Sequence, residues 1–211
     1  MATAQRPKRQ NAVRELKRGL ILDAARKVFE EDGLDGASLR AIAASAGYTP
    51  AALYFHFESK EAIYAEVLRG SLANLEDAVA RSISRTKSPA DRLRTAAMAF
   101  FRYYSENPRD LDLGFYLFRG GMKPHGLGKE RDAMLNAALK AALHPIYDAA
   151  QGLGAKDDEA KYLMVDTFAH ASGLLLLAHT GRMRMFGVST LKLMESFVET
   201  RIAALTQKSR R

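Results

Sequence analysis

Residues 38–57 read SLRAIAASAGYTPAALYFHF, and this stretch decides the fold. Ser38 suits the cap of a helix, and Gly47 ends that helix after eight or nine residues. Thr49 and then Pro50 form a second start signal, a capping residue followed by a proline in the first turn. Two short helices that meet at a glycine have helix-turn-helix spacing, and the second can then lie in a DNA major groove. Four apolar residues can pack inward between them: Leu39, Ile42, Ala43 and Leu53.

Helical spacing extends from this stretch in both directions, and no convincing strand pattern occurs in the chain. Apolar residues from Leu16 to Phe29 predict a first helix that ends at Asp32-Gly33. Ser59 begins a fourth helix that extends to about Arg85. Five more helices are expected. Two lie at about 90–106 and 109–119, and a third follows a glycine-rich loop at 120–128 and ends at about 152. The last two lie at about 160–179 and 189–207. The sequence therefore predicts an all-α fold of about nine helices.

The positive charge is concentrated at the two ends of the chain. The 211 residues include 32 basic and 24 acidic ones, for a net charge of +8. Residues 1–18 carry six basic residues and one acid, residues 201–211 carry four basic residues and no acid, and the middle carries −1. A basic N-terminal arm can bind a polyanion such as DNA, or it can act only as a solubilising tail.

Composition excludes several classes of protein. Cysteine is absent, which excludes disulfides, iron–sulfur clusters, thiolate metal sites and cysteine nucleophiles. The longest uncharged run, at 167–181, is shorter than the ~20 residues that a membrane span needs. No apolar segment follows the basic N-terminus, so we expect no secretory signal. We expect a cytoplasmic protein with no membrane partner.

The residues around the two short helices resemble the TetR family of bacterial transcriptional regulators. The resemblance covers about residues 19–67, while the rest of the chain matches only in length and helicity. Tyr48 departs from the pattern, which usually has a small aliphatic residue there, and this puts the packing of the turn in question. The matching residues are Ala41-Ile42-Ala43, the run from Gly47 to Ile63, the link from Gly33 to Ser38, and Ile21-Leu22-Asp23-Ala24-Ala25 with Phe29.

The resemblance implies a homodimer, formed through the last two helices, that binds a pseudo-palindromic operator in double-stranded DNA. It also implies a C-terminal domain that binds a small effector and so releases the DNA, as in a repressor. A DNA-binding activator, a regulator without an effector, and a helical small-molecule-binding protein without DNA function remain as alternatives. The expected domains are a basic flexible arm at 1–18, a DNA-binding domain at 19–58, and an effector-binding and dimerisation domain at 59–211.

Eight residues are expected to contact DNA: Ser38, Arg40, Thr49, Ala51, Ala52, Tyr54, His56 and Lys60. Thr49 caps the second helix, and its hydroxyl can also reach a phosphate. The methyl groups of Ala51 and Ala52 can contact thymine, or they are simply small enough to let the helix approach closely. Phe57 is expected in the core.

The remaining DNA candidates each have an alternative role. Tyr54 and His56 match the family's backbone-contacting pair, and the alternative for Tyr54 is a half-buried ring. Lys60 lies in a first helical turn, where the dipole disfavours a cation, so a phosphate partner would explain its position. Ser38 can touch a phosphate through its backbone N–H or its hydroxyl. Arg40 can contact phosphate or base, or it can be simply solvated.

Six aromatic residues are candidates for an effector pocket: Phe100, Tyr103, Tyr104, Phe115, Phe118 and Phe168. Such a set suits a largely apolar ligand, but an aromatic cluster more often forms plain core.

Two pairs of metal-ligand residue types share a helix face at i, i+4: Asp166 with His170, and His144 with Asp148. Two such pairs could hold a metal, but a local hydrogen bond in each explains the spacing, so we expect no metal and no other cofactor. The motifs H-E-x-x-H, G-x-S-x-G and the P-loop do not occur. We therefore expect no enzyme.

Overall fold

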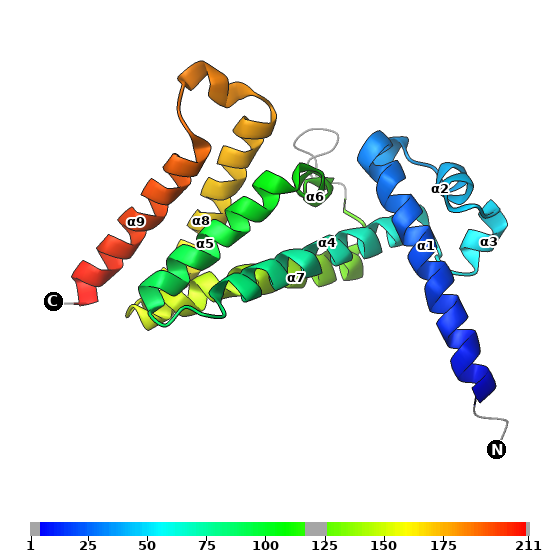
Figure 1. Ribbon diagram of the computed structural model, residues 1–211, viewed down its shortest axis with the longest axis horizontal. Coiled ribbons are helices and arrows are strands. Elements are labelled where there is room, and N and C mark those ends of the chain that lie inside the picture. Colours follow the sequence, from blue (N-terminus) through cyan, green and yellow to red (C-terminus); the bar gives the residue numbers. More distant parts are fainter. Residues whose placement is uncertain (1–4, 117–125, 210–211) are drawn as a thin grey trace. The chain divides into compact units, whose positions relative to one another are not determined.

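The computed structural model describes residues 5–116 and 126–209, with side chains from residue 11 to residue 208 outside the gap. Within these ranges the chain forms α-helices and short 3-10 segments and contains no strand, which confirms the all-α prediction (Figure 1). Among the described helices, none combines the length and the apolar composition that crossing a bilayer requires.

Contacts divide the chain into two compact units. One comprises Met1–Gly70 with Leu111–Leu135, and the other comprises Ser71–Asp110 with Asn136–Arg211. The division therefore falls within a helix, α4 (Lys60–Ile83). The reason lies in the first half of α4, where Tyr64 is fully buried against Phe29 and donates a hydrogen bond to the Leu113 carbonyl.

The first unit is built around α1 (Gln5–Gly36), α2 (Leu39–Ala46) and α3 (Pro50–Tyr54). Gly33, with φ of 69°, interrupts α1 where the sequence predicts its end, and one further turn follows. Residues 5–18, expected as a flexible arm, instead form the first half of α1. Most of these residues are good helix formers, and Pro7 lies in the first turn, where proline is tolerated.

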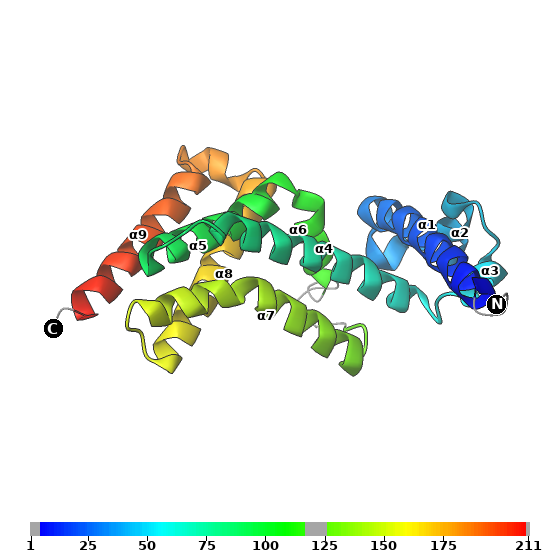
Figure 2. The same cartoon turned by 60° about the horizontal axis from the view of Figure 1, so that its bottom comes forward.

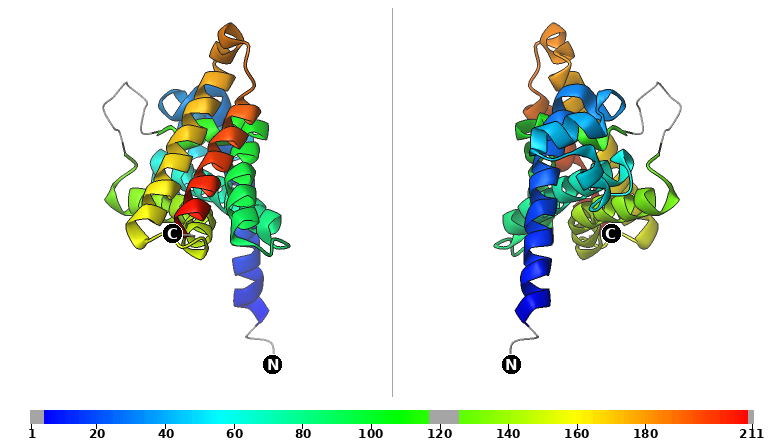
Figure 3. Two further views of the ribbon diagram at one scale, coloured as in Figure 1. Left: turned by 90° about the vertical axis from the view of Figure 1, so that its left-hand side faces the viewer. Right: turned by 90° about the vertical axis from the view of Figure 1, so that its right-hand side faces the viewer.

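The second unit contains α5 (Pro89–Glu106), α8 (Asp157–His179) and α9 (Thr190–Ser209), which pack on one another (Figures 1 and 3). A short 3-10 helix, η2 (Arg182–Phe186), joins α8 to α9 (Figure 2). The core includes Phe100, Leu175 and Met194, all at most 1% exposed.

Besides α4, two further helices run across the division. They are α6 (Pro108–Gly114) and α7 (Lys129–Gly152). Helix α6 ends before residue 119, where the sequence predicts its end, and residues 117–119 lie outside the described part of the chain. Helix α7 continues through Pro145.

Candidate nucleic-acid interface

Side chains cap the N-termini of both helices of the helix-turn-helix. The Ser38 Oγ accepts a hydrogen bond from the Ala41 N–H at 3.1 Å, and the Thr49 Oγ1 accepts one from the Ala52 N–H at 3.3 Å. Between them Gly47 adopts φ of 72°, a left-handed conformation that glycine adopts without strain. The predicted caps and the predicted turn are therefore present.

The inner face of this pair is apolar and tightly packed. Ile42 and Ala43 are fully buried, Leu53 is 1% exposed and Leu39 is half-buried. Phe57 is buried, as the sequence predicts. The opposite side of α3 faces solvent, because Ala51 and Tyr54 are exposed.

The eight DNA candidates come together on the start of α2, on α3 and on the start of α4, within one unit. Five of them are exposed and three are half-buried, the latter being Ala52, His56 and Lys60. Tyr54 is 61% exposed, so the alternative of a half-buried ring does not hold.

Lys60 has a partner within the protein that the sequence did not reveal. Its Nζ donates a hydrogen bond to the Ala37 carbonyl at 2.9 Å. This contact explains a lysine in the first turn of α4 without invoking DNA. An ammonium has three donors, so a phosphate contact remains compatible with it.

His56, directly after α3, is half-buried beside the basic part of α1. Its carbonyl accepts a hydrogen bond from Arg18 Nη1 at 2.8 Å, and its buried Nδ1 has no partner among the described residues. Burial lowers the pKa of the imidazole, and the nearby cations of α1 lower it further: Arg14, Lys17 and Arg18. A phosphate would act in the opposite direction and favour the protonated ring.

Arg18 stabilises the packing of the first unit, whereas the sequence analysis counts it only among the basic residues of the N-terminal arm. Its guanidinium lies 4.1 Å from the centre of the Phe57 ring and forms a 2.8 Å ion pair with Glu66 of α4. It thus fixes α1 against both the end of the helix-turn-helix and α4. Its partners lie about 40 residues away or more, so no local pattern could have identified it.

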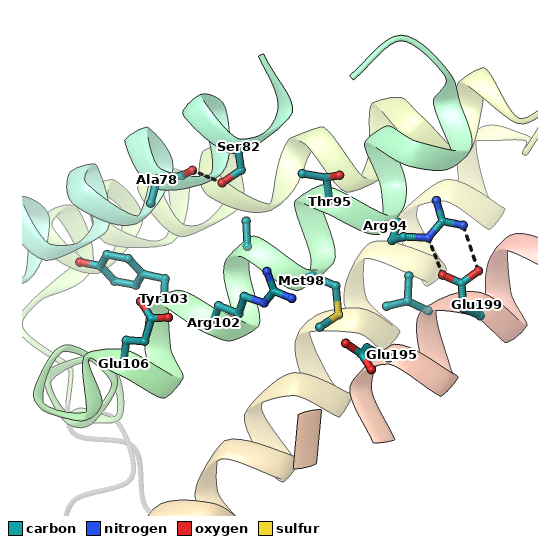
Figure 4. Close-up of a pocket in the computed structure, with 12 residues that line it drawn as sticks. Ala78, Ser82, Arg94, Thr95, Met98, Arg102, Tyr103, Glu106, Glu195 and Glu199 are labelled. Carbon is teal, nitrogen blue, oxygen red and sulfur yellow. Dashed lines mark hydrogen bonds and ion pairs between the residues drawn. The ribbon is translucent and has the colours of Figure 1, made fainter. Parts of the chain in front are cut away.

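A groove of about 640 Å³ lies in the second unit, between α4, α5 and α9 (Figure 4). Ala78, Met98 and Val198 supply part of its apolar lining. Arg94 at the rim of the groove is ion-paired with Glu199. Three further charged residues also line the groove: Arg102, Glu106 and Glu195.

Among the six aromatic residues expected in an effector pocket, Tyr103 alone lines this groove. Phe100 and Tyr104 are buried and pack edge to face, so these two rings form part of the core, and the half-buried ring of Phe168 packs against Phe100. Phe115 belongs to the first unit, and Phe118 lies outside the described residues.

The two candidate metal pairs differ in whether their members contact each other. Asp166 pairs with Arg201 at 3.1 Å, while the His170 ring stacks on Phe197. His144 lies 3.4 Å from Asp148, the local contact that its spacing allows. Across the described residues, no group of three or more His, Cys, Asp or Glu side chains is arranged to hold a metal ion.

Sequence comparison identifies the same segment that the helix-turn-helix occupies. Residues 21–67 match the family model described as bacterial regulatory proteins, tetR family. The HTH-type transcriptional activator FasR of Mycolicibacterium smegmatis is 35% identical over 102 residues, 48% of this chain and 47% of that protein. The HTH-type transcriptional repressor KstR2 of Mycobacterium tuberculosis is 39% identical over 85 residues, 40% of this chain and 42% of that protein. The match thus spans less than half the length of each relative.

Solved structures match over most of the chain. FadR from Bacillus subtilis, in complex with stearoyl-CoA, aligns with a TM-score of 0.67 and 17% identity over 87% of this chain and 96% of that one. A TetR family transcription regulator from Marinobacter aquaeolei aligns with a TM-score of 0.65 and 21% identity, over 92% and 97%. At these identities the likeness shows the fold.

Proposed function

We propose that this chain is a member of the TetR family and a dimeric DNA-binding transcriptional regulator, a proposal that the match of residues 21–67 supports. The observation that carries the proposal is an exposed α3 whose start is capped by Thr49 and whose inner face is anchored by Leu53. That arrangement leaves the outer face free to enter a major groove. We propose that the protein acts in the cytoplasm and catalyses no reaction.

The exposed side chains are proposed to divide into those that contact phosphates and those that contact bases. Arg40, Thr49 and Tyr54 present polar groups at the edges of the helix pair and are proposed to hold phosphates. Ala51, exposed near the start of α3, is proposed to contact a thymine methyl group. Few polar side chains of α3 face outward, so much of the affinity would come from the DNA backbone.

A stripe of apolar and small residues on α8 supports the homodimer. Tyr162, Val165 and Leu176 are 71%, 56% and 50% exposed, with exposed Ala169 and Gly173 between them. The spacing of three and four residues places all five on one face. We propose that the same face of a second copy covers it, with exposed Leu193 of α9 at its side. A two-fold operator requires such a two-fold protein.

The relatives of this chain regulate transcription in both directions. The relatives named above include one activator and one repressor. We propose a repressor released by an effector, with an activator or an effector-independent regulator as the alternative.

The groove between α4, α5 and α9 is proposed as the effector site. Its volume of about 640 Å³ falls in the range of small-molecule sites. The apolar part of the lining, which includes Ala78, Met98 and Val198, supports an effector with an apolar body. A thermal-shift screen of the purified protein against a compound library tests this proposal, because a ligand that binds only the folded state raises the midpoint of unfolding. Variants of groove residues Met98 and Val198 that abolish that shift would locate the effector here.

Selection of duplexes from a random DNA pool, followed by affinity measurements at two salt concentrations, tests the function. A palindromic consensus whose affinity falls steeply with salt supports the dimeric regulator. Absence of both a consensus and a salt dependence, in protein stripped of bound small molecules by denaturation and refolding, would overturn it. The helix-turn-helix would then only stabilise a small-molecule-binding protein.

A further inference from the structure

The first half of α1 extends beyond the part of the chain that the family model covers. The match begins at residue 21, whereas the helix begins at Gln5. Side chains 11–17 are all exposed, and from residue 11 onward the first buried side chain is that of Ile21. Figures 1 and 3 show this part of α1 projecting beyond α2 and α3. Burial within the protein therefore contributes little to the stability of this first half of α1.

The exposed half of α1 has a basic face in a defined position. Arg14, Lys17 and Arg18 are spaced i, i+3 and i+4, so they share one face. Ile21, seven residues after Arg14, continues the same face into the core. The basic face is thus the extension of the face by which α1 packs on the helix-turn-helix.

Contacts at Arg18 place this face beside the DNA candidates. Arg18 donates a hydrogen bond to the carbonyl of His56, two residues beyond α3, and is ion-paired with Glu66. Arg14 and Lys17 lie within about one helical turn of it, towards the N-terminus. In the described part of the chain neither of these two residues forms an ion pair, although Glu15 lies between them. Arg14 and Lys17 lie close enough to His56 to lower the pKa of its imidazole, in addition to the lowering by burial.

We propose that this basic face is a second DNA-binding element, in which Arg14 and Lys17 bind phosphates beside the segment that α3 occupies. The proposal rests on the proposed function and adds to it a part of the chain outside the family segment. Arg6, Lys8 and Arg9 precede these residues in the sequence. From Gln5 to Arg18 the helix extends over about 20 Å at 1.5 Å per residue. At 3.4 Å per base pair, that length corresponds to roughly six base pairs.

An apolar stripe runs beside the basic face on the same half-helix, and it makes an anionic membrane the competing partner. Val13, Leu16 and Leu20 are 46%, 66% and 49% exposed and are spaced as one stripe. A basic amphipathic helix of this kind can also lie on a lipid surface. The contacts of Arg18 with His56 and Glu66 favour DNA, because they turn the basic face towards the helix-turn-helix.

The test compares two double variants of the full-length chain on the duplex that the wild-type protein selects from a random pool. Arg14→Ala with Lys17→Ala removes two cations from the basic face. Arg85→Ala with Lys87→Ala removes two exposed cations from the other unit and is matched in net charge. Both pairs are surface changes, and thermal melts confirm that each variant is folded.

The Arg14/Lys17 variant is expected to lower the slope of log affinity against log salt by about 1.8 for each bound copy, or 0.9 per lost phosphate. Its selected consensus should stay unchanged, because phosphate contacts carry no sequence information. Ethylation interference should lose phosphate positions that the Arg85/Lys87 variant retains.

An unchanged slope for the Arg14/Lys17 variant would overturn the proposal, as would an equal loss in the control. Loss of binding to phosphatidylglycerol-containing vesicles with DNA affinity unchanged would assign the helix to a membrane. Failure of the wild-type protein to select any duplex would instead overturn the proposed function itself.

Discussion

The two units of this molecule are stabilised in different ways. In the first unit, α2 and α3 have only eight and five residues and are closed by specific side chains. In the second, α8 and α9 have 23 and 20 residues and are held mainly by apolar packing. Caps and a left-handed turn each require particular residue types, whereas a packed core accepts many apolar combinations of the right volume. The sequence therefore indicates a function for the first unit more directly than for the second.

Removing a core side chain from the first unit is expected to give the largest effect. Leu53→Ala should lower the free energy of unfolding by about 2–5 kcal/mol, since Leu53 is 1% exposed beneath α3. Hydrogen exchange should rise in α1–α3 and stay unchanged in α8 and α9. Leu93→Ala, at an equally buried site of the second unit, is the matched control and should show the reverse pattern. A uniform rise in both units for either variant would mean that the units do not unfold separately.

A charge on the α8 stripe tests the second unit through its proposed interface. Leu176→Glu would bury a carboxylate twice in a two-fold dimer, and we expect dimer dissociation to become at least ~30-fold easier. Sedimentation equilibrium measures this change. Met185→Glu adds the same charge at a residue that is 78% exposed on η2, off the stripe, and should leave the dimer intact. If the two variants behave alike, the stripe is not the interface.

A buried hydroxyl in the first unit is expected to matter more than an exposed one in the second. Tyr64→Phe leaves the Leu113 carbonyl without its 2.8 Å donor and should cost about 1–3 kcal/mol in urea denaturation. The Tyr147 hydroxyl donates to Asp157 at 2.7 Å, but this bond is exposed, so water can replace it in Tyr147→Phe. Equal losses in the two variants would contradict the distinction between the units.

The helix caps allow the sharpest comparison of function with stability. Thr49→Ala and Ser88→Ala each remove a side-chain cap, of α3 and of α5, and each should cost about 1 kcal/mol. Only Thr49→Ala should also weaken DNA binding, because the Thr49 hydroxyl lies on the surface that we propose enters the DNA major groove. Fluorescence anisotropy on the selected duplex, at a temperature where both variants are fully folded, separates the two effects. Equal affinities would limit Thr49 to capping.

Local chemistry explains what the sequence predicted well. Ser38, Gly47 and Thr49 act on backbone groups within a few residues, so their roles follow from the adjacent sequence. Phe57 was placed correctly in the core for a similar reason, since it lacks a polar group and follows an amphipathic stretch.

Contacts between distant residues explain what the sequence did not predict. The partner of Lys60 is the carbonyl of Ala37, and the aromatic partner of Arg18 is Phe57, both far away in the chain. The aromatic set could not be divided between core and pocket, because helical periodicity shows which face is apolar but not whether that face meets a cavity or another helix. Phe100 and Tyr104 turned out to pack on each other.

Two histidines, one in each unit, give the smallest expected effect. Burial lowers the pKa of both His56 and His170. The unfolded chain, with a histidine pKa near 6.5, then takes up protons before the folded chain does, so stability falls as the pH drops through about 6.5. His56→Gln and His170→Gln should each flatten this part of the stability profile, as urea titrations between pH 5 and 8 would show.

DNA binding should separate the two histidines. A phosphate near His56 favours the protonated ring and opposes the lowering that Arg14, Lys17 and burial impose. Affinity for the selected duplex should therefore rise as the pH falls below about 7, an effect that His56→Gln abolishes and His170→Gln leaves in place. His170 stacks on Phe197 in the second unit, where we propose no DNA contact. If the two substitutions changed the pH dependence of DNA affinity alike, His56 would be a packing residue and the division of function between the units would need revision.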